Sequence, residues 1–376
     1  MIARKLTETI QKYLSYGKVI IIYGARQVGK TTLIQEFLKT KKDVLQLNCD
    51  NPPTVSSLTN ASLAELKMIV GNHKIVFIDE AQRVKNIGLT LKLIYDNIPD
   101  VQLIVSGSSS FDLANEINEP LTGRKFELML TPLSIGEIYD NEGYIEVKSK
   151  LNHHIVFGMY PDITTNPQAA ETNLLNLSSS YLYKDIFEWQ RIRKPEVIQK
   201  LLKALALQIG SEISYNELSR LLGISKDTIA SYIQLLEQAF VIYRLPSFSR
   251  NLRTELRHKS KVYFWDTGVR NALINNFNPI EDRPDKGALW ENFVINEIRK
   301  KNLNQDQNSN YYFWRTVRQQ EVDLIMETNQ KLSAFEIKWN LNKSAKIPKP
   351  FKDNYPNAET QIIRPNQFLE FILAPR

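Results

Sequence analysis

A glycine-rich stretch near the start of the chain has residue types and spacing suited to binding a phosphate. It matches G-x-x-x-x-G-K-[ST] in full, from Gly24 to Gly29, Lys30 and Thr31. Glycines let backbone N–H groups turn inward around an anion, lysine supplies a charge for β/γ-phosphates, and the threonine hydroxyl can ligate Mg²⁺. The predicted ATP-contacting residues are Gly24, Ala25, Arg26, Gln27, Val28, Gly29, Lys30, Thr31 and Thr32. A chance match in a βα turn is the alternative.

Two carboxylates complete the pattern of an ATP site. The apolar residues from Ile75 to Ile78 are followed directly by Asp79 and Glu80. Acids at the carboxyl end of a buried parallel strand lie where ligands bind in open α/β sheets. We predict that Asp79 holds Mg²⁺, directly or through water, and that Glu80 orients and polarises the attacking water. Taken alone, an Asp-Glu pair is also typical of a helix N-terminus.

Further polar residues follow at positions typical of groups that contact the γ-phosphate. The apolar run 101–105 leads to Ser106 and Ser108, of which we prefer Ser108. A serine-rich turn that caps the next helix remains open as the alternative. Arg124 is predicted to stabilise transition-state charge, in cis or from a neighbouring subunit. The alternative for Arg124 is an ordinary surface arginine.

The last third of the chain carries a second set of carboxylates, accompanied by a lysine. Side chains alternate along a strand, so Glu336 and Lys338 share one face. Asp323 can converge on them from a neighbouring strand, and Glu291 can join from a helix. This set matches the Asp…Glu-x-Lys pattern of nucleases, in which Glu291, Asp323 and Glu336 would bind Mg²⁺ and Lys338 would position the water. A solvent-facing ladder of ion pairs is the alternative.

Hydrophobic periodicity indicates the elements that must position these residues. A short apolar run before the glycine loop and helical spacing after it predict strand, loop and helix. Strands are predicted over 18–22, 43–48, 74–80, 101–105, 311–315, 321–326 and 331–339. Helices are predicted over 1–14, 32–38, 63–69, 174–189, 197–209, 214–222, 225–236 and 289–298.

The middle of the chain has the pattern of a helix-turn-helix. Ser214 and Glu217 form a capping box, Gly223 makes the turn, and Ser225 caps a second helix. A strand over 239–245 suits a wing. The residues expected to face outward from the second helix are Lys226, Thr228, Ser231 and Gln234. Such a helix contacts DNA in many proteins, but winged helices also bind protein partners, and both interpretations stay open.

The segment from Arg244 to Arg270 is rich in basic residues with interleaved aromatics. The basic residues are Arg244, Arg250, Arg253, Arg257, Lys259, Lys261 and Arg270. The aromatics are Phe248, Tyr263, Phe264 and Trp265. This mixture favours a surface that follows a phosphate backbone. A solvated basic face over a small apolar core is the alternative.

Composition limits the classes of protein to consider. The 376 residues are 43% hydrophobic and 24% charged, and the net charge of +7 permits contact with nucleic acid. A single cysteine, Cys49, excludes an internal disulfide framework and suits a reducing cytoplasm. No apolar run approaches the roughly 20 residues that span a bilayer. We therefore expect a cytoplasmic protein without a membrane partner.

These motifs together resemble a prokaryotic AAA-type ATPase family. The residues that carry the resemblance are Gly-Ala-Arg-Gln-Val-Gly-Lys-Thr-Thr, Ile-Asp-Glu-Ala-Gln, Ser-Gly-Ser-Ser, Leu-Thr-Gly-Arg and Thr-Pro-Leu-Ser. The resemblance implies the additional-strand, catalytic-glutamate class of P-loop ATPases, with a C-terminal domain of unknown function that is similar to restriction-endonuclease-like folds. Two positions depart from the family pattern: Met159 replaces the second glycine of Gly-Gly-aromatic-Pro, and Gln320 replaces a glycine before Glu-Val-Asp.

The expected fold is α/β: a P-loop ATPase with a parallel sheet, a helical and winged-helix module, and a C-terminal α/β nuclease-like domain. The expected boundaries are 1–150 for the AAA-type ATPase, 151–194 for a helical linker or lid, 195–250 for the winged helix, and 251–376 for the nuclease-like domain. The first functional hypothesis is a Mg²⁺-dependent ATPase that engages DNA. The second is a nucleotide-dependent switch or scaffold that binds a protein partner with an inactive tail. Either would allow a homo-oligomer.

Overall fold

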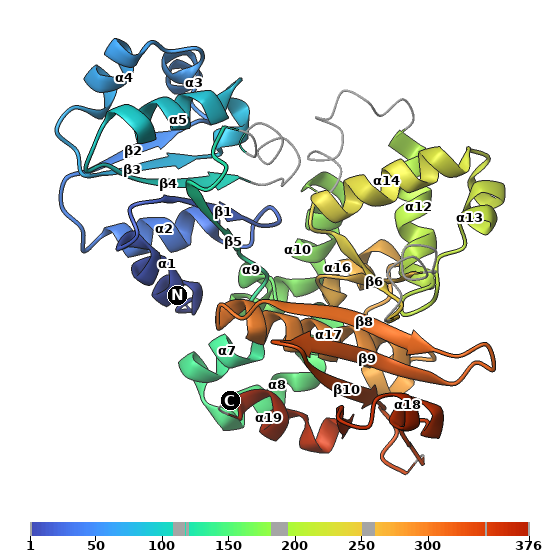
Figure 1. Ribbon diagram of the computed structural model, residues 1–376. Helices are drawn as coiled ribbons and strands as arrows, with labels where there is room; N and C mark the ends of the chain where they lie inside the picture. Colours follow the sequence, from blue (N-terminus) through green and yellow to red (C-terminus); the bar gives the residue numbers. More distant parts are fainter. Residues whose placement is uncertain are drawn as a thin grey trace. The chain divides into compact units, whose positions relative to one another are not determined.

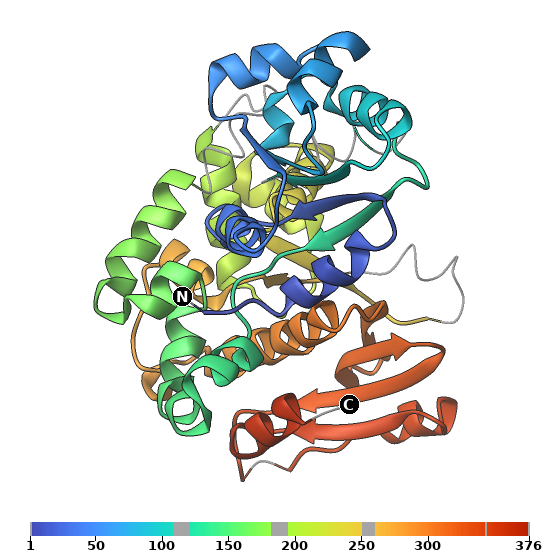
Figure 2. The same cartoon turned by 90° about the vertical axis from the view of Figure 1, so that its left-hand side faces the viewer.

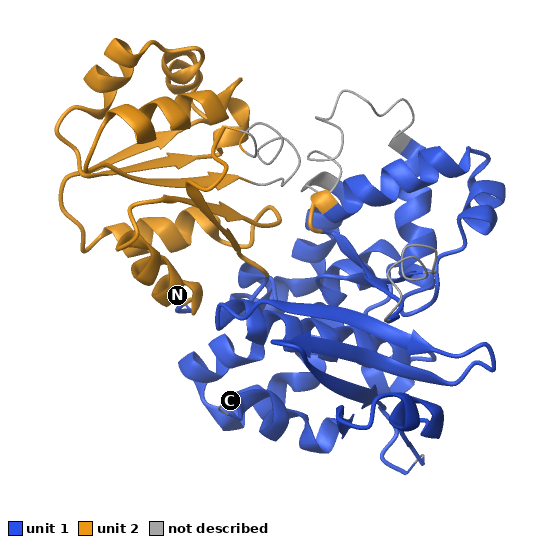
Figure 3. Ribbon diagram, in the orientation of Figure 1, with its two compact units in different colours: residues 1–3, 132–237, 241–376 blue, residues 4–131, 238–240 orange. Residues whose placement is uncertain are grey.

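The computed structural model describes residues 2–107, 117, 120–181, 195–249, 260–342 and 344–374, with the side chains of 180, 181 and 195 left aside. The chain divides into two compact units (Figure 3). Unit 2 comprises residues 4–131 and 238–240, and unit 1 comprises residues 1–3, 132–237 and 241–376. Among the described residues, no helix has the length and apolar character needed to cross a membrane.

Unit 2 is built on a parallel sheet of five strands. Its strands are β1 (Val19–Tyr23), β2 (Val44–Asn48), β3 (Ile75–Asp79), β4 (Gln102–Gly107) and β5 (Lys125–Met129). Their order across the sheet is β2-β3-β4-β1-β5, and every neighbouring pair is parallel. Strand β4 is therefore inserted between β1, which precedes the glycine loop, and β3, which ends at Asp79. This is the additional-strand arrangement that the family resemblance implies.

Helices cover both faces of this sheet, because its central strands are apolar on both sides. All five residues of β1 are buried. The helices are α1 (Leu6–Leu14), α2 (Lys30–Leu38), α3 (Pro52–Leu58), α4 (Leu63–Val70) and α5 (Ile87–Asn97), with a short 3-10 turn η1 (Ala81–Arg83). Figure 1 shows α1 and α2 on one face and α3, α4 and α5 on the other. One core cluster joins the second face to the helices that cover it.

The first part of unit 1 is helical. Its elements are α7 (Ile135–Glu142), α8 (Tyr144–Phe157), α9 (Pro161–Thr165), η2 (Pro167–Ala169), α10 (Ala170–Asn176) and the π-helical η3 (Leu177–Tyr181). Ser134 and Glu137 form a capping box at the start of α7. The predicted helix over 174–189 thus begins earlier, and its part beyond residue 181 lies outside the described residues.

Three helices and a hairpin follow in unit 1. They are α12 (Pro195–Leu207), α13 (Tyr215–Leu222), α14 (Lys226–Gln238), β6 (Ile242–Pro246) and β7 (Ser260–Phe264). Ser214 accepts a hydrogen bond from the Glu217 backbone, Gly223 has a φ of 67°, and Ser225 caps α14. Strands β6 and β7 are antiparallel. The helices α13 and α14 and the strand β6 lie close to the predicted ranges, and their assignment to a winged helix stays a prediction.

The last part of unit 1 is a four-stranded sheet with helices. The elements are α16 (Thr267–Leu273), η4 (Ile280–Asp282), α17 (Lys286–Asn304), β8 (Ser309–Arg315), β9 (Glu321–Thr328), β10 (Lys331–Ile337), α18 (Lys349–Asn354), β11 (Glu359–Ile363) and α19 (Pro365–Leu373). The strand order is β11-β10-β9-β8, with β10 and β11 parallel and the other pairs antiparallel. The long helix α17 lies along this sheet in both views (Figure 1, Figure 2).

The boundaries of the two units differ from the four predicted domains. Residues 132–150 were expected to belong to the ATPase domain but lie in unit 1. The physical reason is a buried connection to α17. Glu297 accepts a hydrogen bond from the Ile135 backbone at 2.7 Å, and Lys300 donates to the Leu133 carbonyl at 2.9 Å. The three regions expected after residue 150 are likewise packed in one unit.

Candidate functional site

The glycine loop of unit 2 is tightly packed at its first residue and left-handed at its last. A Cβ atom on Gly24 would lie 2.2 Å from the Leu130 carbonyl oxygen, so only glycine fits beside the end of β5. Gly29 has a φ of 94°, which disfavours residues with a Cβ. Helix α2 begins at the next residue, Lys30. The backbone around the loop is therefore set by glycine at two positions of the motif.

The Lys30 side chain is buried and satisfied by the loop itself. Its Nζ donates to the carbonyl oxygens of Gly24 and Ala25, both at 3.0 Å. These contacts hold the ammonium group inside the glycine loop. A buried positive charge at that place favours an approaching anion such as a phosphate.

The two predicted magnesium ligands from separate motifs touch each other. Thr31 Oγ1 donates to Asp79 Oδ2 at 2.8 Å. Asp79 Oδ1 accepts a short hydrogen bond from Ser106 Oγ, on the adjacent strand β4. Ser106 is fully buried, and it also accepts a 3.4 Å hydrogen bond from the Glu80 backbone N–H. Ser106 thus orients Asp79, while the preferred candidate Ser108 lies outside the described residues.

Glu80 adopts an unusual backbone conformation. Its φ of 52° is left-handed, although it is not a glycine. Such a conformation costs on the order of 1–3 kcal/mol and often marks a functional residue. Its carboxylate accepts a hydrogen bond from Gln82 Nε2 at 2.6 Å. Gln82 therefore positions the predicted catalytic carboxylate, a role that its place in the motif did not reveal.

Arg4 holds the loop from outside the motif. Its guanidinium donates to the Val28 carbonyl at 2.8 Å and to the Thr131 carbonyl at 2.6 Å. It therefore ties the glycine loop to the segment that follows β5. Sequence analysis missed Arg4, because an arginine 24 residues before its partner gives no local signal.

Arg124 is ion-paired on the surface of unit 2. Its Nε lies 2.9 Å from Asp96 Oδ1, and both side chains are about one-third exposed. The predicted contact with a phosphate would require Arg124 to exchange this partner. The other ATP-contacting candidates, from Ala25 to Thr32, all lie in the loop and the first turn of α2.

The donor set at this loop fits Mg²⁺. A hydroxyl oxygen and a carboxylate oxygen already converge at Thr31 and Asp79, and Mg²⁺ prefers oxygen ligands together with substrate phosphates. The adjoining loop and Lys30 suit the phosphates of ATP.

In unit 1 the predicted nuclease residues converge as the strand pattern implied. Lys338 Nζ lies 3.0 Å from Asp323 Oδ2 and 2.8 Å from Glu336 Oε1. Asp323 Oδ2 also accepts from the Ile337 backbone N–H at 2.7 Å. We call Glu291, Glu321, Asp323 and Glu336 the carboxylate centre. Its convergence is a matter of geometry, and the chemical roles assigned to its members remain predictions.

The pairing of β8 and β9 is irregular beside Asp323. Tyr312 pairs with Ile325 and Trp314 pairs with Val322, so β8 has one residue between these pairs where β9 has two. The extra residue falls at Asp323 or Leu324. Bulges redirect side chains and are common beside functional sites, which explains how Asp323 reaches Lys338 from a strand with buried neighbours on both sides.

Sequence analysis did not anticipate a second lysine in this centre. Lys261, on β7, is only 2% exposed. Its Nζ lies 3.3 Å from Glu291 Oε1 and forms a short ion pair with Glu321. Tyr263 donates to the same Glu291 oxygen at 2.5 Å. Partners 30 and 60 residues away determine this burial, so no local pattern predicts it.

Burial and neighbouring charges shift the pKa values in the centre. Burial raises the pKa of Glu291 to about 7; Lys261 lowers it and Asp323 raises it further. Burial and the nearby Asp323 also raise the pKa of Glu336. For Lys338, burial alone would lower the pKa, but Asp323 and Glu336 raise it overall. The centre therefore stabilises positive charge on its lysines.

The centre as folded does not fit a divalent metal. In the part of the chain that the structure describes, no group of three or more His, Cys, Asp or Glu residues is arranged to hold one. Lysine ammonium groups contact Glu291, Asp323 and Glu336, although these are the three predicted metal ligands. We therefore derive no metal-dependent step at this centre.

The predicted phosphate-following surface is wrong for Lys261, Arg270 and three of its aromatic residues, which are buried. Arg244 pairs with Glu237 at 2.6 Å, and Lys261 and Arg270 are buried in ion pairs. The aromatics Tyr263, Phe264 and Trp265 are buried too. The buried basic and aromatic residues of this segment are therefore explained by packing against α17 and its neighbours and not by exposure to solvent. The remaining basic residues of this segment, Arg250, Arg253, Arg257 and Lys259, lie outside the described residues.

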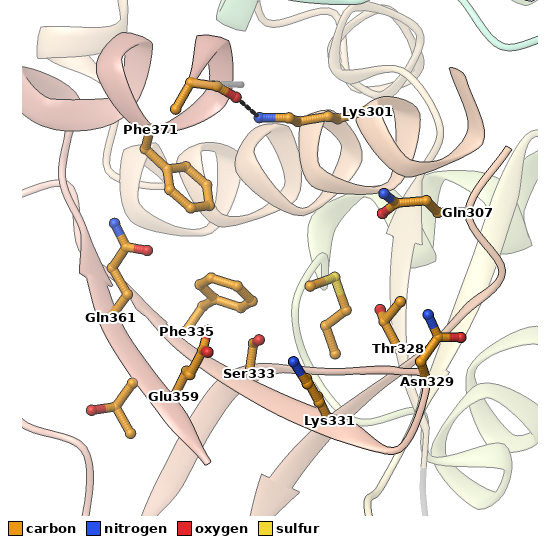
Figure 4. Close-up of a pocket in the computed structure, with 13 residues that line it drawn as sticks. Lys301, Gln307, Thr328, Asn329, Lys331, Ser333, Phe335, Glu359, Gln361 and Phe371 are labelled. Carbon is orange, nitrogen blue, oxygen red and sulfur yellow. Dashed lines mark hydrogen bonds between the residues drawn. The ribbon is translucent and has the colours of Figure 1, made fainter. Parts of the chain in front are cut away.

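A pocket of about 660 Å³ lies on the C-terminal sheet, away from these groups (Figure 4). Its lining includes Ser333 and Phe335 of β10, Lys301 of α17 and Phe371 of α19. Ser333 and Phe335 alternate with Glu336 along β10 and so point to the opposite face of the sheet. The pocket therefore contains none of the predicted site residues.

Comparison with known families divides the chain into three parts. Residues 16–139 match the model of an AAA domain. Residues 148–279 match a domain of unknown function, DUF8612, and residues 286–369 match another, DUF4143. The AAA-type ATPase expectation is thus supported over residues 16–139. The restriction-endonuclease-like fold of the C-terminal domain stays a prediction.

Similar proteins occur in bacteria and archaea. An uncharacterized protein of Mycobacterium tuberculosis is 25% identical over 339 residues, covering 89% of this chain and 73% of that protein. One of Methanocaldococcus jannaschii is 26% identical over 367 residues, covering 92% and 80%. A Walker-type ATPase structure from Pyrococcus abyssi is 17% identical, with a TM-score of 0.48 and coverage of 71% and 94%. At this TM-score the similarity supports no further inference.

Proposed function

We propose that this protein binds ATP in the glycine loop of unit 2 and hydrolyses it with Mg²⁺. The observation that carries the proposal is the 2.8 Å contact between Thr31 Oγ1 and Asp79 Oδ2. It joins the two expected magnesium ligands, which come from motifs 48 residues apart. The AAA domain match over residues 16–139 supports the same activity. The buried single cysteine is compatible with a reducing cytoplasm, where we expect the protein to act.

Each residue has a distinct proposed role. Lys30 counters the charge of the β- and γ-phosphates, and Thr31 and Asp79 hold Mg²⁺, which when bound neutralises further phosphate charge. Glu80 orients the attacking water and accepts its proton. Ser106 keeps Asp79 in place through its hydrogen bond. Arg124 stabilises transition-state charge, within the same chain or from a second copy in a homo-oligomer.

Two substitutions separate binding from turnover. We expect Lys30→Ala to lose nucleotide affinity, and Glu80→Gln to retain affinity while hydrolysis falls about 100-fold or more. Phosphate release and binding of a fluorescent ATP analogue measure the two effects. Lys39→Ala and Glu36→Gln are matched controls, because this pair is exposed on the same helix. Unchanged turnover in both Lys30→Ala and Glu80→Gln would contradict the proposal.

DNA engagement through α14 is a second candidate function. One face of α14 buries Ile229, Tyr232, Ile233 and Leu236. Lys226, Ser231 and Gln234 are exposed. An exposed polar face on the second helix of a helix-turn-helix is the face that reads DNA. The same face would also suit a protein partner, which is the alternative.

Fluorescence anisotropy with a labelled duplex tests this candidate. We expect Lys226→Glu with Gln234→Glu to weaken binding at least tenfold, with a shallower salt dependence because one phosphate contact is lost. Lys200→Glu with Gln199→Glu, both exposed on α12, provides a charge-matched control. Equal loss in both pairs would indicate a general charge effect and would count against α14 as the reading helix.

DNA cleavage by the C-terminal domain is the finer hypothesis from the sequence. The convergence of Asp323, Glu336 and Lys338 supports it, but the lysine-filled centre does not fit the metal that cleavage needs. Incubation with plasmid and linear DNA in Mg²⁺ or Mn²⁺, with and without ATP, distinguishes the outcomes. Cleavage that is lost in both Asp323→Ala and Lys338→Ala would support a nuclease. No cleavage with intact ATP hydrolysis would favour a nucleotide-dependent switch or scaffold.

A further inference from the structure

Lys261 occupies an unusual position for a lysine. It is 2% exposed and comes from β7, whereas the carboxylates around it come from α17 and β9. Lysine is rarely buried unless it is paired, because desolvating its charge is costly. Here it contacts Glu291 and Glu321 at once, so its charge is shared by two carboxylates.

The contacts of Lys261 remove oxygens that a metal ion would need. Glu291 Oε1 receives both the Lys261 ammonium and the Tyr263 hydroxyl. On the other side of the centre, Lys338 takes one oxygen each from Asp323 and Glu336. Two ammonium groups thus serve four carboxylates, and the positive charge in the centre belongs to the chain itself.

One oxygen in the centre lacks a partner. Glu336 is 8% exposed, and its Oε2 is buried with no hydrogen-bond partner among the described residues. A carboxylate oxygen left in this way is a ready ligand for a cation. A single oxygen does not hold Mg²⁺ or Mn²⁺, which take about six ligands, so Glu291 would have to be freed as well.

Lys261 and its partners belong to different parts of the sequence. Lys261 lies in the region that matches DUF8612, and Glu291 and Glu321 lie in the region that matches DUF4143. Backbone pairing fixes Lys261 in place, since it pairs with Leu245 of β6 and bridges to Glu212. The hairpin that follows the helix-turn-helix therefore completes the carboxylate centre of the C-terminal domain.

We propose that the Lys261 ammonium is the resident cation of the carboxylate centre and keeps it closed to divalent metal ions. A metal ion that bound there would have to displace the Lys261 ammonium, which is attached to strand β7 and cannot diffuse away. Removing that charge while keeping the side-chain length should leave Glu291 and Glu321 without the Lys261 ammonium. Their oxygens, together with the unpartnered Glu336 Oε2, would then be available to a divalent ion. The proposal concerns metal binding alone, so it does not depend on ATP hydrolysis or DNA binding.

Mn²⁺ binding measured by electron paramagnetic resonance tests the proposal on the full chain. All variants carry Asp79→Asn, which removes the acid predicted to hold a metal in unit 2. We expect no Mn²⁺ bound at the centre with Lys261 present, and an affinity at least about tenfold higher in Lys261→Met. Adding Glu336→Gln to Lys261→Met should abolish the gain.

Three controls make the outcome decisive. Lys286→Met removes an exposed ammonium that donates to the Glu281 carbonyl, and it should leave Mn²⁺ binding unchanged. Lys261→Arg keeps a cation and should remain closed to Mn²⁺. A folded Lys261→Met, judged by circular dichroism, that binds no more Mn²⁺ would overturn the proposal. If Lys261→Met does not fold, the chain that keeps Lys261 still tests the proposal. Mn²⁺ binding to that chain that is abolished by Glu336→Gln would overturn the proposal. No such Mn²⁺ binding would support it.

Discussion

Lys30 and Lys261 are both buried ammonium groups, and their partners suggest why one suits a ligand and the other does not. Lys30 donates to two carbonyl oxygens of the glycine loop, where the motif places the β- and γ-phosphates of ATP. Lys261 contacts two carboxylates, so its charge is already compensated. Because Coulomb energies grow in a low-dielectric interior, these two carboxylates leave the Lys261 site little attraction for an anion.

At the residue scale, we predict that Arg4→Ala weakens ATP binding about tenfold. Arg4 donates to the Val28 and Thr131 carbonyls, and losing charge-assisted hydrogen bonds of about 1.5–3 kcal/mol each would loosen the glycine loop. Titration with a fluorescent nucleotide measures the effect. Lys41→Ala, which removes an exposed cation bonded to Gln11, is the control. Equal affinity in Arg4→Ala and the control would show that Arg4 does not position the loop.

Gly24→Ala should remove nucleotide binding altogether. Its Cβ would come within 2.2 Å of the Leu130 carbonyl oxygen, so the loop or the chain after β5 must move. Gly17→Ala is the matched control: its φ of +65° is left-handed, but a Cβ there meets nothing within 4 Å. It should cost only about 1 kcal/mol and leave binding intact. Retained affinity in Gly24→Ala would contradict the close approach.

The residues that the sequence predicted are those whose chemistry is local. The loop from Gly24 to Thr31, and Asp79 with Glu80, carry their pattern within a few positions, and the strand alternation was enough to bring Glu336 and Lys338 together. Lys261 could not be predicted in this way. It stands in a basic stretch that is typical of a surface, and only the fold brings Glu291 and Glu321 to it.

At the scale of elements, the substituted glycine motif has a clear structural role in unit 1. Gly158 has a φ of +71°, and a Cβ there would lie 2.0 Å from Asp266 Oδ1. The next residue, Met159, donates its backbone N–H to Asp266 Oδ2 at 2.8 Å. Asp266 also caps α16 through the Val269 N–H. Replacing the second glycine by methionine preserves this bond, because only the backbone takes part.

We predict that Asp266→Asn lowers the free energy of unfolding of unit 1 by about 1–3 kcal/mol. Asparagine keeps one acceptor oxygen but turns an NH₂ group toward one of the two backbone donors. Trp265, Trp290, Trp314 and Trp339 lie in unit 1, and the sequence of unit 2 contains no tryptophan, so tryptophan fluorescence in urea does not report on unit 2. Asp162→Asn, at an exposed position in the first turn of α9, should change little. An equal effect of the two would argue against the tie between α8 and α16.

His154 on α8 should make unit 1 sensitive to acid. It is 1% exposed, and burial followed by the nearby charges of His153, Lys150 and Lys300 lowers its pKa to about 3 from 6.5. The unfolded chain then binds a proton that the folded chain does not. This contribution to stability is complete above pH 6.5 and is lost as pH falls toward 3, by about 1.4 kcal/mol per pH unit.

Urea unfolding followed by tryptophan fluorescence at pH 7 and pH 5.5 tests the role of His154. His154→Leu removes the titrating ring. Between pH 7 and pH 5.5, its free energy of unfolding should therefore fall by about 1.4 kcal/mol less than that of the unchanged chain. His73→Leu is the control: His73 belongs to unit 2, so this substitution should leave the tryptophan fluorescence transition unchanged. If the free energy of unfolding falls equally in His154→Leu and in the unchanged chain, a group other than His154 controls the acid sensitivity of unit 1.

Helices and strands were predicted at the right places where the hydrophobic period and the capping residues agree. The lengths of the elements were predicted less well. The predicted helix over 289–298 becomes α17, Lys286–Asn304. Its C-terminal end carries buried polar residues, such as Lys300 and Asn302, that break the apolar pattern and are satisfied by tertiary hydrogen bonds. Such partners lie far away in the sequence, so a local window stops short of them.

At the scale of the whole molecule, the boundary between the units is itself testable. The expected end of the ATPase domain was residue 150, but α8 spans Tyr144–Phe157 and α7 begins at Ile135. The buried pair Glu297 and Lys300 faces the Ile135 N–H and the Leu133 carbonyl. A cut at 150 would divide α8 and leave both charged groups without these backbone partners.

We therefore predict that a fragment of residues 132–376 folds cooperatively and that a fragment of residues 151–376 does not. The shorter fragment loses α7, half of α8 and the buried side chains Ile138 and Val147. An unpartnered buried donor or acceptor costs about 1–3 kcal/mol, and several such losses approach the 5–15 kcal/mol stability of a typical domain. Tryptophan fluorescence and circular dichroism in urea measure both fragments. A sharp transition at similar urea concentration in the two fragments would place the boundary at 150, because α7 and the first half of α8 would then contribute nothing to unit 1.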